Sequence, residues 1–411
     1  MKMLIFGGSG KMGRSIAWDL IKQSDVEVVG LVDRDAAGLR AAQTWLGSDK
    51  IHLHQHDVLD IPATKSLMEQ YNVAVVSLPN RQTSYRIIQA GVEAGIHLVD
   101  ILEEYHRRPD PYETEGLEVP PGMSPYDYGD WLHETAIQND VTVLDGFGFA
   151  PGMSNITTGE GIRKLDQAHT AVARVGGIPS KAASKRHPLS YMITWAFDHV
   201  LREYMVDLNV IKDGKIVEVP AMSDYERFRF TEFGLDEELE CAVTPGMPSF
   251  LFTRSGLQAF AEKTVRWPGH FQGIETLKSV GMLDLESIEV GGQSLVPREV
   301  LLAAITPRLK PLEEDTDVCT MWNTVEGIKD GKDARVDYYL WDEMDVENGI
   351  SSMGRVTGYS AAIGAVYVGR GEIATRGIVP PEDAISSDLY TAYVQDLAKR
   401  GIDVLEKVSW G

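Results

Sequence analysis

The stretch Met1-Lys-Met-Leu-Ile-Phe-Gly-Gly-Ser-Gly-Lys-Met-Gly13 decides the fold of this chain. An apolar strand over residues 3–6 leads into the pattern Gly8-x-Gly10-x-x-Gly13, and an amphipathic helix follows at once. A second strand over residues 26–32 ends on Asp33, about twenty residues past the last glycine. Strand, glycines, helix, strand and acid in this order are typical of a dinucleotide-binding βαβ unit.

Each glycine of this pattern has an expected role. Gly8 permits the tight turn, Gly10 lets the backbone approach a pyrophosphate, and Gly13 lets helix and strand pack closely. The N–H groups at the start of the helix then face the phosphate charge. The residues expected to contact the cofactor are Gly8, Ser9, Gly10, Lys11, Met12, Gly13, Asp33, Arg34, Asp57, Val58, Leu78, Pro79 and Asn80.

Asp33 indicates which dinucleotide is bound. A carboxylate at the end of the second strand accepts hydrogen bonds from the ribose hydroxyls of adenosine and repels a 2′-phosphate. Arg34 follows directly, and its guanidinium could cover the adenine or pair with that phosphate. The sequence therefore predicts NAD, with NADP as the alternative.

The strand–helix alternation continues through the first third of the chain. Further strands are expected at 51–58, 73–78, 96–99 and 141–144, and helices at 36–46, 61–71, 81–95 and 130–139. The strands end on Asp57, on Pro79-Asn80 and on Asp100, at the edge where an open parallel sheet binds its ligand. Residues 103–130 are rich in proline and tyrosine and predict an irregular excursion, either a lid or a dimer contact.

The predicted fold class is α/β: a Rossmann-type doubly wound parallel sheet plus a second, mixed α/β domain. We expect a dinucleotide-binding domain at 1–148, a substrate-binding and dimerisation domain at 149–352, and a C-terminal return at 353–411 that packs on the first domain. The second domain is expected to contain strands at 169–175, 208–212, 215–219, 286–290 and 334–340, and helices at 190–204, 253–263 and 297–304. Small residues dominate 353–368, which predicts a closely packed helix.

Composition excludes several classes of function. The net charge is −22, from 39 Lys and Arg against 61 Asp and Glu, which argues against nucleic acid and anionic membranes as partners. The sequence contains no run of ~18 apolar residues, so no membrane span is expected. Cys241 and Cys319 are too few for a disulfide framework, so a cytoplasmic protein is expected. His52, His54 and His56 alternate on one strand face, which favours a polar surface over a metal site; no metal is predicted.

Five short motifs, here called islands, lie in the second half of the chain, and neither helix nor strand periodicity explains their residues. They are Gly148–Met153, Val175–Pro179, Lys263–His270, Pro297–Leu302 with Thr306-Pro307, and Gly369–Glu382. With the glycine pattern and Val99-Asp100, these islands closely resemble the saccharopine dehydrogenase-like superfamily, and within it the NAD-dependent L-lysine 6-dehydrogenases. The resemblance implies hydride transfer to the nicotinamide from a carbon that bears nitrogen. It also implies an amino acid substrate and a homodimer.

Three residues are the candidates for catalysis, namely Asp100, Arg266 and His270. Asp100 could hold the substrate ammonium and take its proton, or it could only cap the following turn. Arg266 offers a fork to a carboxylate, and His270 is expected to titrate near neutrality and to act as an acid or base, or else to be structural. The residues expected to bind substrate are Asp100, Gly152, Met153, Gly177, Tyr191, Arg266 and His270.

The substrate follows less directly from the sequence. The resemblance favours oxidative deamination at the ε-amino group of lysine or a close diamino acid. Basic residues at 181–187 would instead suit a substrate with several carboxylates, so a saccharopine or carboxylated-polyamine dehydrogenase acting on a secondary amine is the alternative. A non-catalytic NAD-binding sensor is a third reading, which the acid and base candidates disfavour.

Overall fold

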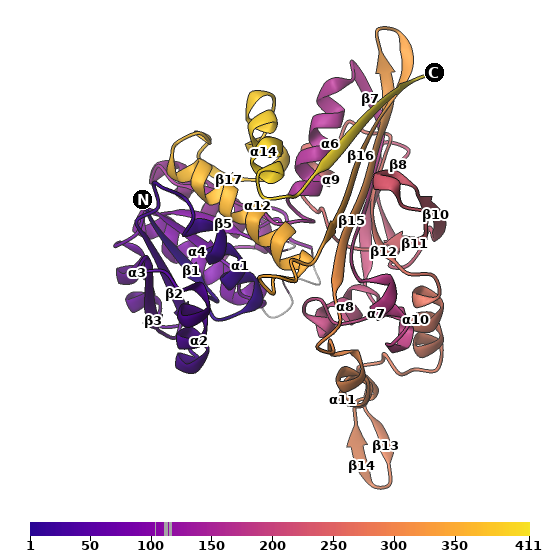
Figure 1. Cartoon of the computed structure of the whole chain (residues 1–411), viewed down its shortest axis with the longest axis horizontal. Coiled ribbons are helices and arrows are strands. Elements are labelled where there is room, and N and C mark those ends of the chain that lie inside the picture. Colours follow the sequence, from indigo (N-terminus) through magenta and orange to yellow (C-terminus); the bar gives the residue numbers. More distant parts are fainter. Residues whose placement is uncertain (103, 111–113, 115–116) are drawn as a thin grey trace.

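The computed structural model describes residues 1–102, 104–110, 114 and 117–411. Residues 103, 111–113 and 115–116 of the predicted excursion lie outside the described residues. The chain forms two large sheets that stand side by side, with helix α12 (Ser352–Gly369) between them (Figure 1). This arrangement confirms the predicted α/β class with a doubly wound parallel sheet and a second, mixed sheet.

The first sheet has seven strands in the order β17-β6-β5-β4-β1-β2-β3, and its paired strands are parallel. The chain reversal beside β1 places the ends of β1 and β4 at the point where such sheets bind ligands. The strands are β1 (Lys2–Phe6), β2 (Val28–Asp33), β3 (Ile51–Gln55), β4 (Val73–Val76), β5 (His97–Asp100), β6 (Thr142–Leu144) and β17 (Gly377–Val379). The helices are α1 (Lys11–Leu20), α2 (Ala36–Leu46), α3 (Ile61–Met68), α4 (Arg81–Ala94) and α5 (Pro125–Gln138).

Helices cover both faces of this sheet. Met3 and Ile5 of β1 pack with apolar residues of α1, α2 and α12, whereas Leu4 and Phe6 pack with residues of α3, α4 and α5. A strand that is buried on both faces must be apolar throughout, which explains the unbroken run in β1. The helices begin where sequence signals predict: the side chain of Asp35 caps α2, and that of Asn80 caps α4.

The second sheet has nine strands and is mixed, since β12 and β7 are parallel whereas β7 and β15 are antiparallel. Its strands are β7 (Gln167–Pro179), β8 (Asp207–Lys212), β9 (Lys215–Pro220), β10 (Glu226–Phe230), β11 (Glu237–Val243), β12 (Ala259–Arg266), β15 (Asp317–Lys329), β16 (Lys332–Glu343) and β18 (Val404–Trp410). The helices of this region are α6 (Met153–Lys164), α7 (Lys181–Ser184), α8 (Phe197–Glu203), α9 (Phe250–Thr253), α10 (His270–Ser279) and α11 (Pro297–Leu309), with short 3₁₀ turns at 188–190 and 232–234. A separate hairpin of β13 (Ile288–Val290) and β14 (Gln293–Leu295) projects beside α11 (Figure 1).

Several elements of the second domain differ from the prediction. The expected helix at 253–263 is wrong, because residues 259–263 belong to strand β12, which lies between β7 and β11. The expected helix at 190–204 is shortened to α8. Strands β10, β11 and β15 lie where no strand was predicted. β11 and β15 each pair with a strand on both sides, and β10 pairs with β11, and local propensity does not report such partners.

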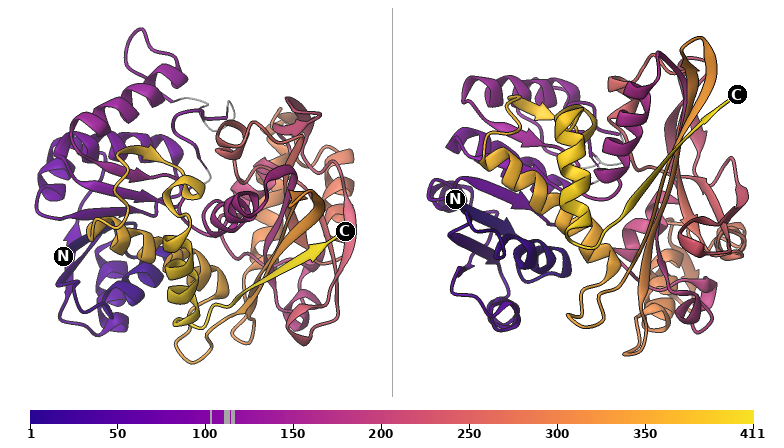
Figure 2. Two further views of the ribbon diagram at one scale, coloured as in Figure 1. Left: turned by 90° about the horizontal axis from the view of Figure 1, so that it is seen from above. Right: turned by 45° about the horizontal axis from the view of Figure 1, so that its top comes forward.

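The C-terminal segment returns to the first domain, as Figure 2 shows from two further directions. Helix α12 packs on α1, and strand β17 pairs with β6. Helices α13 (Pro381–Ala384) and α14 (Asp388–Ala398) follow. The last strand, β18, pairs with β16 of the second sheet. The C-terminal segment was expected to stay on the first domain, but its end lies on the second. Among the described helices, none is both long and apolar enough to cross a bilayer.

Candidate active site

The glycine turn between β1 and α1 is built by close contacts. Gly7 has a left-handed backbone (φ 79°), and the N–H groups of Gly7 and Gly8 each donate to the Val32 carbonyl at 3.0 Å. A Cβ on Gly8 would lie 2.7 Å from Leu31 Cβ, and one on Gly13 would lie 2.3 Å from the Gly7 oxygen. The residue that makes the turn is therefore Gly7, and Gly8 allows packing against β2, which corrects the role expected for Gly8.

The start of α1 fits a diphosphate. Gly10 is the N-cap, and a Cβ placed on it would meet only the Gly7 oxygen, at 3.2 Å. Backbone N–H groups at this helix start suit a bound phosphate. Asp33 is held beside the turn, because the Ser9 hydroxyl (2.5 Å) and amide (3.3 Å) both donate to its Oδ2. These residues fit the ribose and diphosphate of a dinucleotide.

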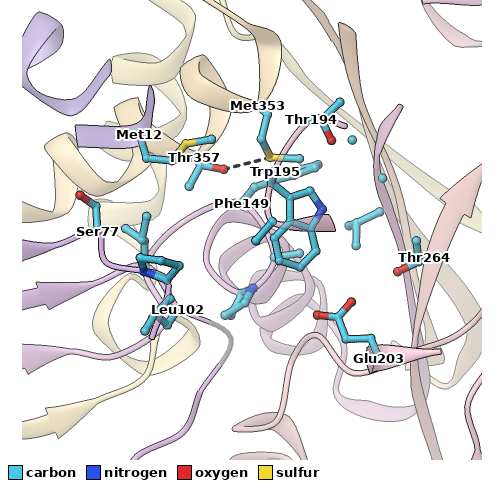
Figure 3. A pocket seen from close by; sticks show the side chains of 18 of the residues that line it. Met12, Ser77, Leu102, Phe149, Thr194, Trp195, Glu203, Thr264, Met353 and Thr357 are labelled. Carbon is cyan, nitrogen blue, oxygen red and sulfur yellow. Dashed lines mark hydrogen bonds between the residues drawn. The ribbon is translucent and has the colours of Figure 1, made fainter. Parts of the chain in front are cut away.

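A cavity of about 300 Å³ lies between the two sheets, next to this turn (Figure 3). Its first-domain wall consists of Gly10, Lys11, Met12, Ser77, Leu78, Pro79, Arg81, Ile101 and Leu102. The remaining walls consist of Phe149, Ala150, Pro151, Val175, Gly176, Gly177, Thr194, Trp195, Ala196, Glu203, Pro245, Glu262, Thr264, Arg266, Met353 and Thr357. The cavity is thus shared by the dinucleotide-binding domain, the second sheet and α12.

Of the predicted residues, the structure brings seven to this cavity: Gly10, Lys11, Met12, Leu78, Pro79, Gly177 and Arg266. The others lie elsewhere. Arg34 and Asp57 are exposed, Val58 is half-buried after β3, and Asn80 caps α4. Gly152 is the N-cap of α6, and Met153 and Tyr191 are fully buried.

Arg266 is the cation of the second-domain wall. It is only 4% exposed, and its Nε donates to the Tyr204 hydroxyl at 3.0 Å while its Nη1 donates to the Val265 carbonyl at 3.0 Å. Its guanidinium also lies 5.4 Å from the centre of the Tyr191 ring. These contacts fix the planar group at the cavity wall, where it can hold a carboxylate.

Two carboxylates share this wall with Arg266, namely Glu203 of α8 and Glu262 of β12. Glu203 Oε1 lies 2.9 Å from Nε2 of His199, and that nitrogen lies 2.8 Å from Nη2 of Arg81 in α4. These contacts link α8 of the second domain to α4 of the first. Figure 3 shows Glu203 and Thr264 with their polar atoms directed into the cavity.

Asp100 lies in a buried cluster and does not line the cavity. It accepts hydrogen bonds from the Leu102 amide, at 2.8 Å, and from the Ser84 hydroxyl, and burial raises its pKa. His106 lies beside it, with Nε2 at 3.9 Å from Asp100 Oδ2 and Nδ1 at 2.5 Å from Asp145 Oδ1. Burial alone would lower the pKa of His106, but Asp145 and then Asp100 raise it to about 9.

His270 is also fully buried and outside the cavity wall. One ring nitrogen lies 3.1 Å from the Tyr204 hydroxyl, and the other lies 3.0 Å from the Leu189 carbonyl. Burial, and then the charge of Arg266, lowers the pKa of His270 to about 3. This differs from the expected titration near neutrality. Through Tyr204, His270 supports Arg266 from behind.

The basic segment after β7 is occupied by structural ion pairs. Lys181 lies 2.5 Å from Glu237, and both Arg186 and His187 contact Asp315. Residues 181–187 do not line the cavity. The observation that had favoured a substrate with several carboxylates therefore has a structural explanation.

The histidines of the β3 region have ordinary partners. His54 Nε2 lies 2.6 Å from the Tyr71 hydroxyl, and His56 Nε2 lies 2.7 Å from Thr64 Oγ1. Within the described part of the chain, no group of three His, Cys, Asp or Glu side chains is placed to hold a metal ion.

Comparison with known proteins identifies the family. Residues 3–145 match the saccharopine dehydrogenase NADP binding domain, and residues 148–402 match the saccharopine dehydrogenase C-terminal domain. The chain therefore belongs to the saccharopine dehydrogenase family, as the resemblance implied. The first match also confirms a domain for a nicotinamide dinucleotide.

Individual relatives agree with this assignment. The carboxyaminopropylagmatine dehydrogenase of Synechocystis sp. is 21% identical over 401 residues, which cover 93% of both chains. The alpha-aminoadipic semialdehyde synthase of Arabidopsis thaliana is 26% identical over 174 residues, or 39% of this chain and 16% of that protein. The apo saccharopine dehydrogenase (L-Glu forming) of Saccharomyces cerevisiae has the same fold, with a TM-score of 0.78 at 19% identity over 99% of both chains.

Sequence reasoning missed Glu203 and Glu262. Glu203 stands in a stretch whose helix was predicted, yet nothing there marks which helix face meets the cavity. Glu262 precedes the Lys263–His270 island. Because a helix was expected at 253–263, the alternation of side chains between the two faces of strand β12 was not recognised. A strand prediction there would have placed residues 262, 264 and 266 on one face.

Proposed function

We propose that this protein is a nicotinamide-dependent dehydrogenase that oxidises the carbon beside the secondary amine of a carboxylated polyamine. The observation that carries the proposal is the placement of two buried carboxylates, Glu203 and Glu262, beside Arg266 on the second-domain wall, with Lys11 and Arg81 on the first-domain wall. A substrate with one carboxylate and several cationic nitrogens complements this set. Saccharopine has three carboxylates, and any of them placed beside Glu203 or Glu262 would meet a like charge.

Each charged residue has a role in the proposed reaction. Arg266 binds the substrate carboxylate through its fork. Glu203 takes the proton from the secondary ammonium, because only a neutral amine can release hydride from its neighbouring carbon. The nicotinamide accepts that hydride when the cofactor is bound. Water then cleaves the resulting substrate imine into an aldehyde and a free amine.

Asp100 and His270 have supporting roles in this proposal. Asp100 accepts from the Leu102 amide and so positions Ile101 and Leu102, which line the cavity. His270 orients Arg266 through the Tyr204 hydroxyl. Both act through other residues, which suits side chains buried outside the cavity wall.

Lysine, which the sequence favoured as the substrate, fits this wall less well. Its ε-amine must be neutral to react, so lysine would bring one cation, the α-ammonium, to a wall that contains Glu203 and Glu262. A polyamine keeps a further cation after its reacting nitrogen loses a proton. The relative named carboxyaminopropylagmatine dehydrogenase, which aligns over nearly the whole chain, supports the same ranking.

We propose NAD as the cofactor. Asp33 is oriented by Ser9 and by the Asp35 amide, which donates to Oδ1 at 3.2 Å. A carboxylate held at this place repels a 2′-phosphate. Arg34 is exposed and forms no ion pair with another described residue, so it stays available to a 2′-phosphate, which keeps NADP as the alternative.

We further propose a cytoplasmic homodimer. Cys241 and Cys319 are both free and buried, as suits a reducing compartment. The β13–β14 hairpin exposes Ile288 (52%) and Val290 (51%) on an isolated two-stranded sheet. Such a hairpin is marginally stable alone in water, so we expect a second copy of the chain to pack on it.

The proposal is tested by cofactor reduction with a panel of amines. Purified protein would receive NAD or NADP together with carboxyaminopropylagmatine, lysine or saccharopine, and reduced cofactor would be followed by absorbance. We expect the highest kcat/KM with carboxyaminopropylagmatine and NAD. Glu203→Gln should lower kcat by ~10²–10⁴-fold, because the proton acceptor is lost. A higher kcat/KM for lysine or saccharopine would contradict the proposal, and no reduction with any amine would favour the sensor.

A further inference from the structure

A second cavity lies between the two domains. It has a volume of about 270 Å³, and it shares Lys11 and Thr194 with the cavity described above, here called the substrate cavity. Its first-domain side consists of Lys11, Arg14 and Ser15 of α1 and Trp45 of α2, and its other side consists of residues within 192–194, 311–317 and 344–351. Ligand cavities usually begin at about 300 Å³, so this space suits a small molecule. The proposed reaction does not use it.

Two cations without ionic partners lie on the first-domain side. Within the part of the chain that the structure describes, the buried Nε of Arg14 makes no hydrogen bond, and neither Arg14 nor Lys11 forms an ion pair. The Arg14 guanidinium lies 5.6 Å from the centre of the Trp45 ring. Lys11 and Arg14 are three positions apart at the start of α1, so their like charges repel each other near the positive end of the helix dipole. An anion bound between them would stabilise both.

The second-domain side carries carboxylates instead. The basic segment 181–187 already pairs with Asp315, and the two oxygens of Asp317 accept backbone N–H groups at 2.7 and 3.0 Å. Glu313 is exposed and forms no ion pair with another described residue. Burial raises the pKa of Asp317, while the backbone N–H groups and the charge of Lys11 partly offset that rise, so the two sides are near enough to interact. The cavity is therefore positive on one side and negative on the other.

Apolar side chains make up much of the remaining wall. They are Trp45, Met192, Ile193, Leu312, Met344 and Ile350. A hydrated anion such as phosphate would leave these side chains uncovered, whereas a ligand with a hydrocarbon group would bury apolar surface against them. The cavity thus matches a molecule that has a carboxylate, an ammonium and a short apolar body.

We propose that this second cavity binds a free α-amino acid with an apolar side chain. The carboxylate of the ligand contacts Arg14 and Lys11, its ammonium faces Glu313 and Asp317, and its side chain packs beside Trp45. A zwitterion complements both sides at once, whereas an anion alone would meet carboxylates and a cation alone would meet Arg14. The site is separate from the proposed reaction, because Arg14, Trp45 and Glu313 do not line the substrate cavity.

Calorimetry tests which groups of the ligand are recognised. L-Leucine would be titrated into the whole protein, beside 4-methylpentanoate, which lacks the ammonium, and leucinamide, which lacks the carboxylate. We expect leucine to bind at least 10-fold more tightly than either analogue, because each analogue loses a hydrogen bond to a charged group. L-Methionine and L-phenylalanine extend the panel. Binding of inorganic phosphate without binding of the three amino acids would overturn the proposal, and so would no binding at all.

Two variants test the two sides of the cavity separately. Arg14→Gln should weaken leucine and 4-methylpentanoate by at least 10-fold, whereas Glu313→Gln should weaken leucine alone, because only leucine carries the ammonium. Arg40→Gln removes an exposed cation of α2 outside the cavity, so this matched control should bind leucine as wild type does. Equal loss in Arg40→Gln and Arg14→Gln, or unchanged leucine affinity in Arg14→Gln, would overturn the proposal.

A further variant separates this site from the substrate cavity. Arg266→Gln removes a cation of the substrate cavity and should leave leucine affinity unchanged. NAD affinity, measured for Arg14→Gln and Arg266→Gln, shows that each variant is folded. Loss of leucine binding in Arg266→Gln but not in Arg14→Gln would place the amino acid in the substrate cavity and overturn the proposal. Because these results do not depend on turnover, the second site can be confirmed even if no amine is oxidised.

Discussion

His106 is the buried residue whose charge most directly links pH to stability. Its ring lies between Asp100 and Asp145, and all three side chains are essentially unexposed. The His106 amide also donates to Asp145 Oδ2 at 2.9 Å, so the cluster fixes the backbone that leaves β5. A protonated imidazole between two carboxylates satisfies both, whereas a neutral ring leaves an uncompensated negative charge.

The raised pKa of His106 predicts how stability depends on pH. The pKa is about 9 in the folded protein and 6.5 in an unfolded chain, so the folded state holds this proton more tightly. The stabilisation, up to about 3 kcal/mol, is complete below pH 6.5 and is lost as pH rises through 9. Urea unfolding at pH 6 and pH 9.5 should show a steeper decline for wild type than for His106→Gln. His52→Gln, at an exposed position of β3, is the control, and parallel declines in all three proteins would contradict the account.

Residues that act within one local motif could be predicted from the sequence. The glycine turn and Asp33 lie within a single βαβ unit, so spacing alone identified them. Glu203 and Glu262 could not be found this way, because the roles proposed for them depend on a wall that distant segments build. The roles expected for Asp100 and His270 rested on residue type, which does not report whether a side chain reaches the cavity.

At the scale of elements, the packing of α12 on α1 depends on glycine. A Cβ on Gly354 would lie 2.6 Å from Ser15 Oγ, and one on Gly358 would lie 2.9 Å from Ser15 Cβ. The small residues of α12 had predicted such close packing, and this prediction is confirmed. Helix α1 begins at the glycine turn, so its position also fixes the cofactor site.

A larger residue in this contact should affect both stability and cofactor binding. Gly358→Val must push α12 away from Ser15, and overpacking of this kind costs about 1–3 kcal/mol. We expect a lower melting temperature and a weaker NAD affinity by calorimetry. Ala398→Val, on the exposed side of α14, adds similar volume without such a contact and should change neither quantity. Normal melting and NAD affinity for Gly358→Val would show that the helices need not approach so closely.

Elements of the first domain were more predictable than those of the second for a physical reason. Parallel strands buried on both faces are apolar throughout, and capped helices separate them at regular intervals. In the second sheet, β12 reads Ala-Phe-Ala-Glu-Lys-Thr-Val-Arg, which contains good helix formers. Its strand state depends on pairing with β7, β8 and β11, and that information is not local.

At the scale of the whole molecule, the candidate active site depends on how the chain crosses between its two domains. The first sheet ends at β6, the second sheet follows, and α12 and β17 then return to the first domain before β18 rejoins the second. One apolar cluster extends from β1 through α12 to β15 and β16, so the two walls of the cavity have a common core. The sequence predicted both domains, but not that three charged side chains of the second would face the glycine turn of the first.

We propose that substrate and cofactor meet in this shared cavity and that hydride passes directly between them. The most direct measurement uses carboxyaminopropylagmatine with deuterium on the carbons that flank its secondary amine, together with NAD. The reduced cofactor would be isolated and its nicotinamide C4 position analysed by proton NMR. Direct transfer would place one deuterium at C4, on a single face of the nicotinamide ring. Reduced cofactor without deuterium, or deuterated substrate that gives no reduced cofactor, would contradict direct hydride transfer in the cavity.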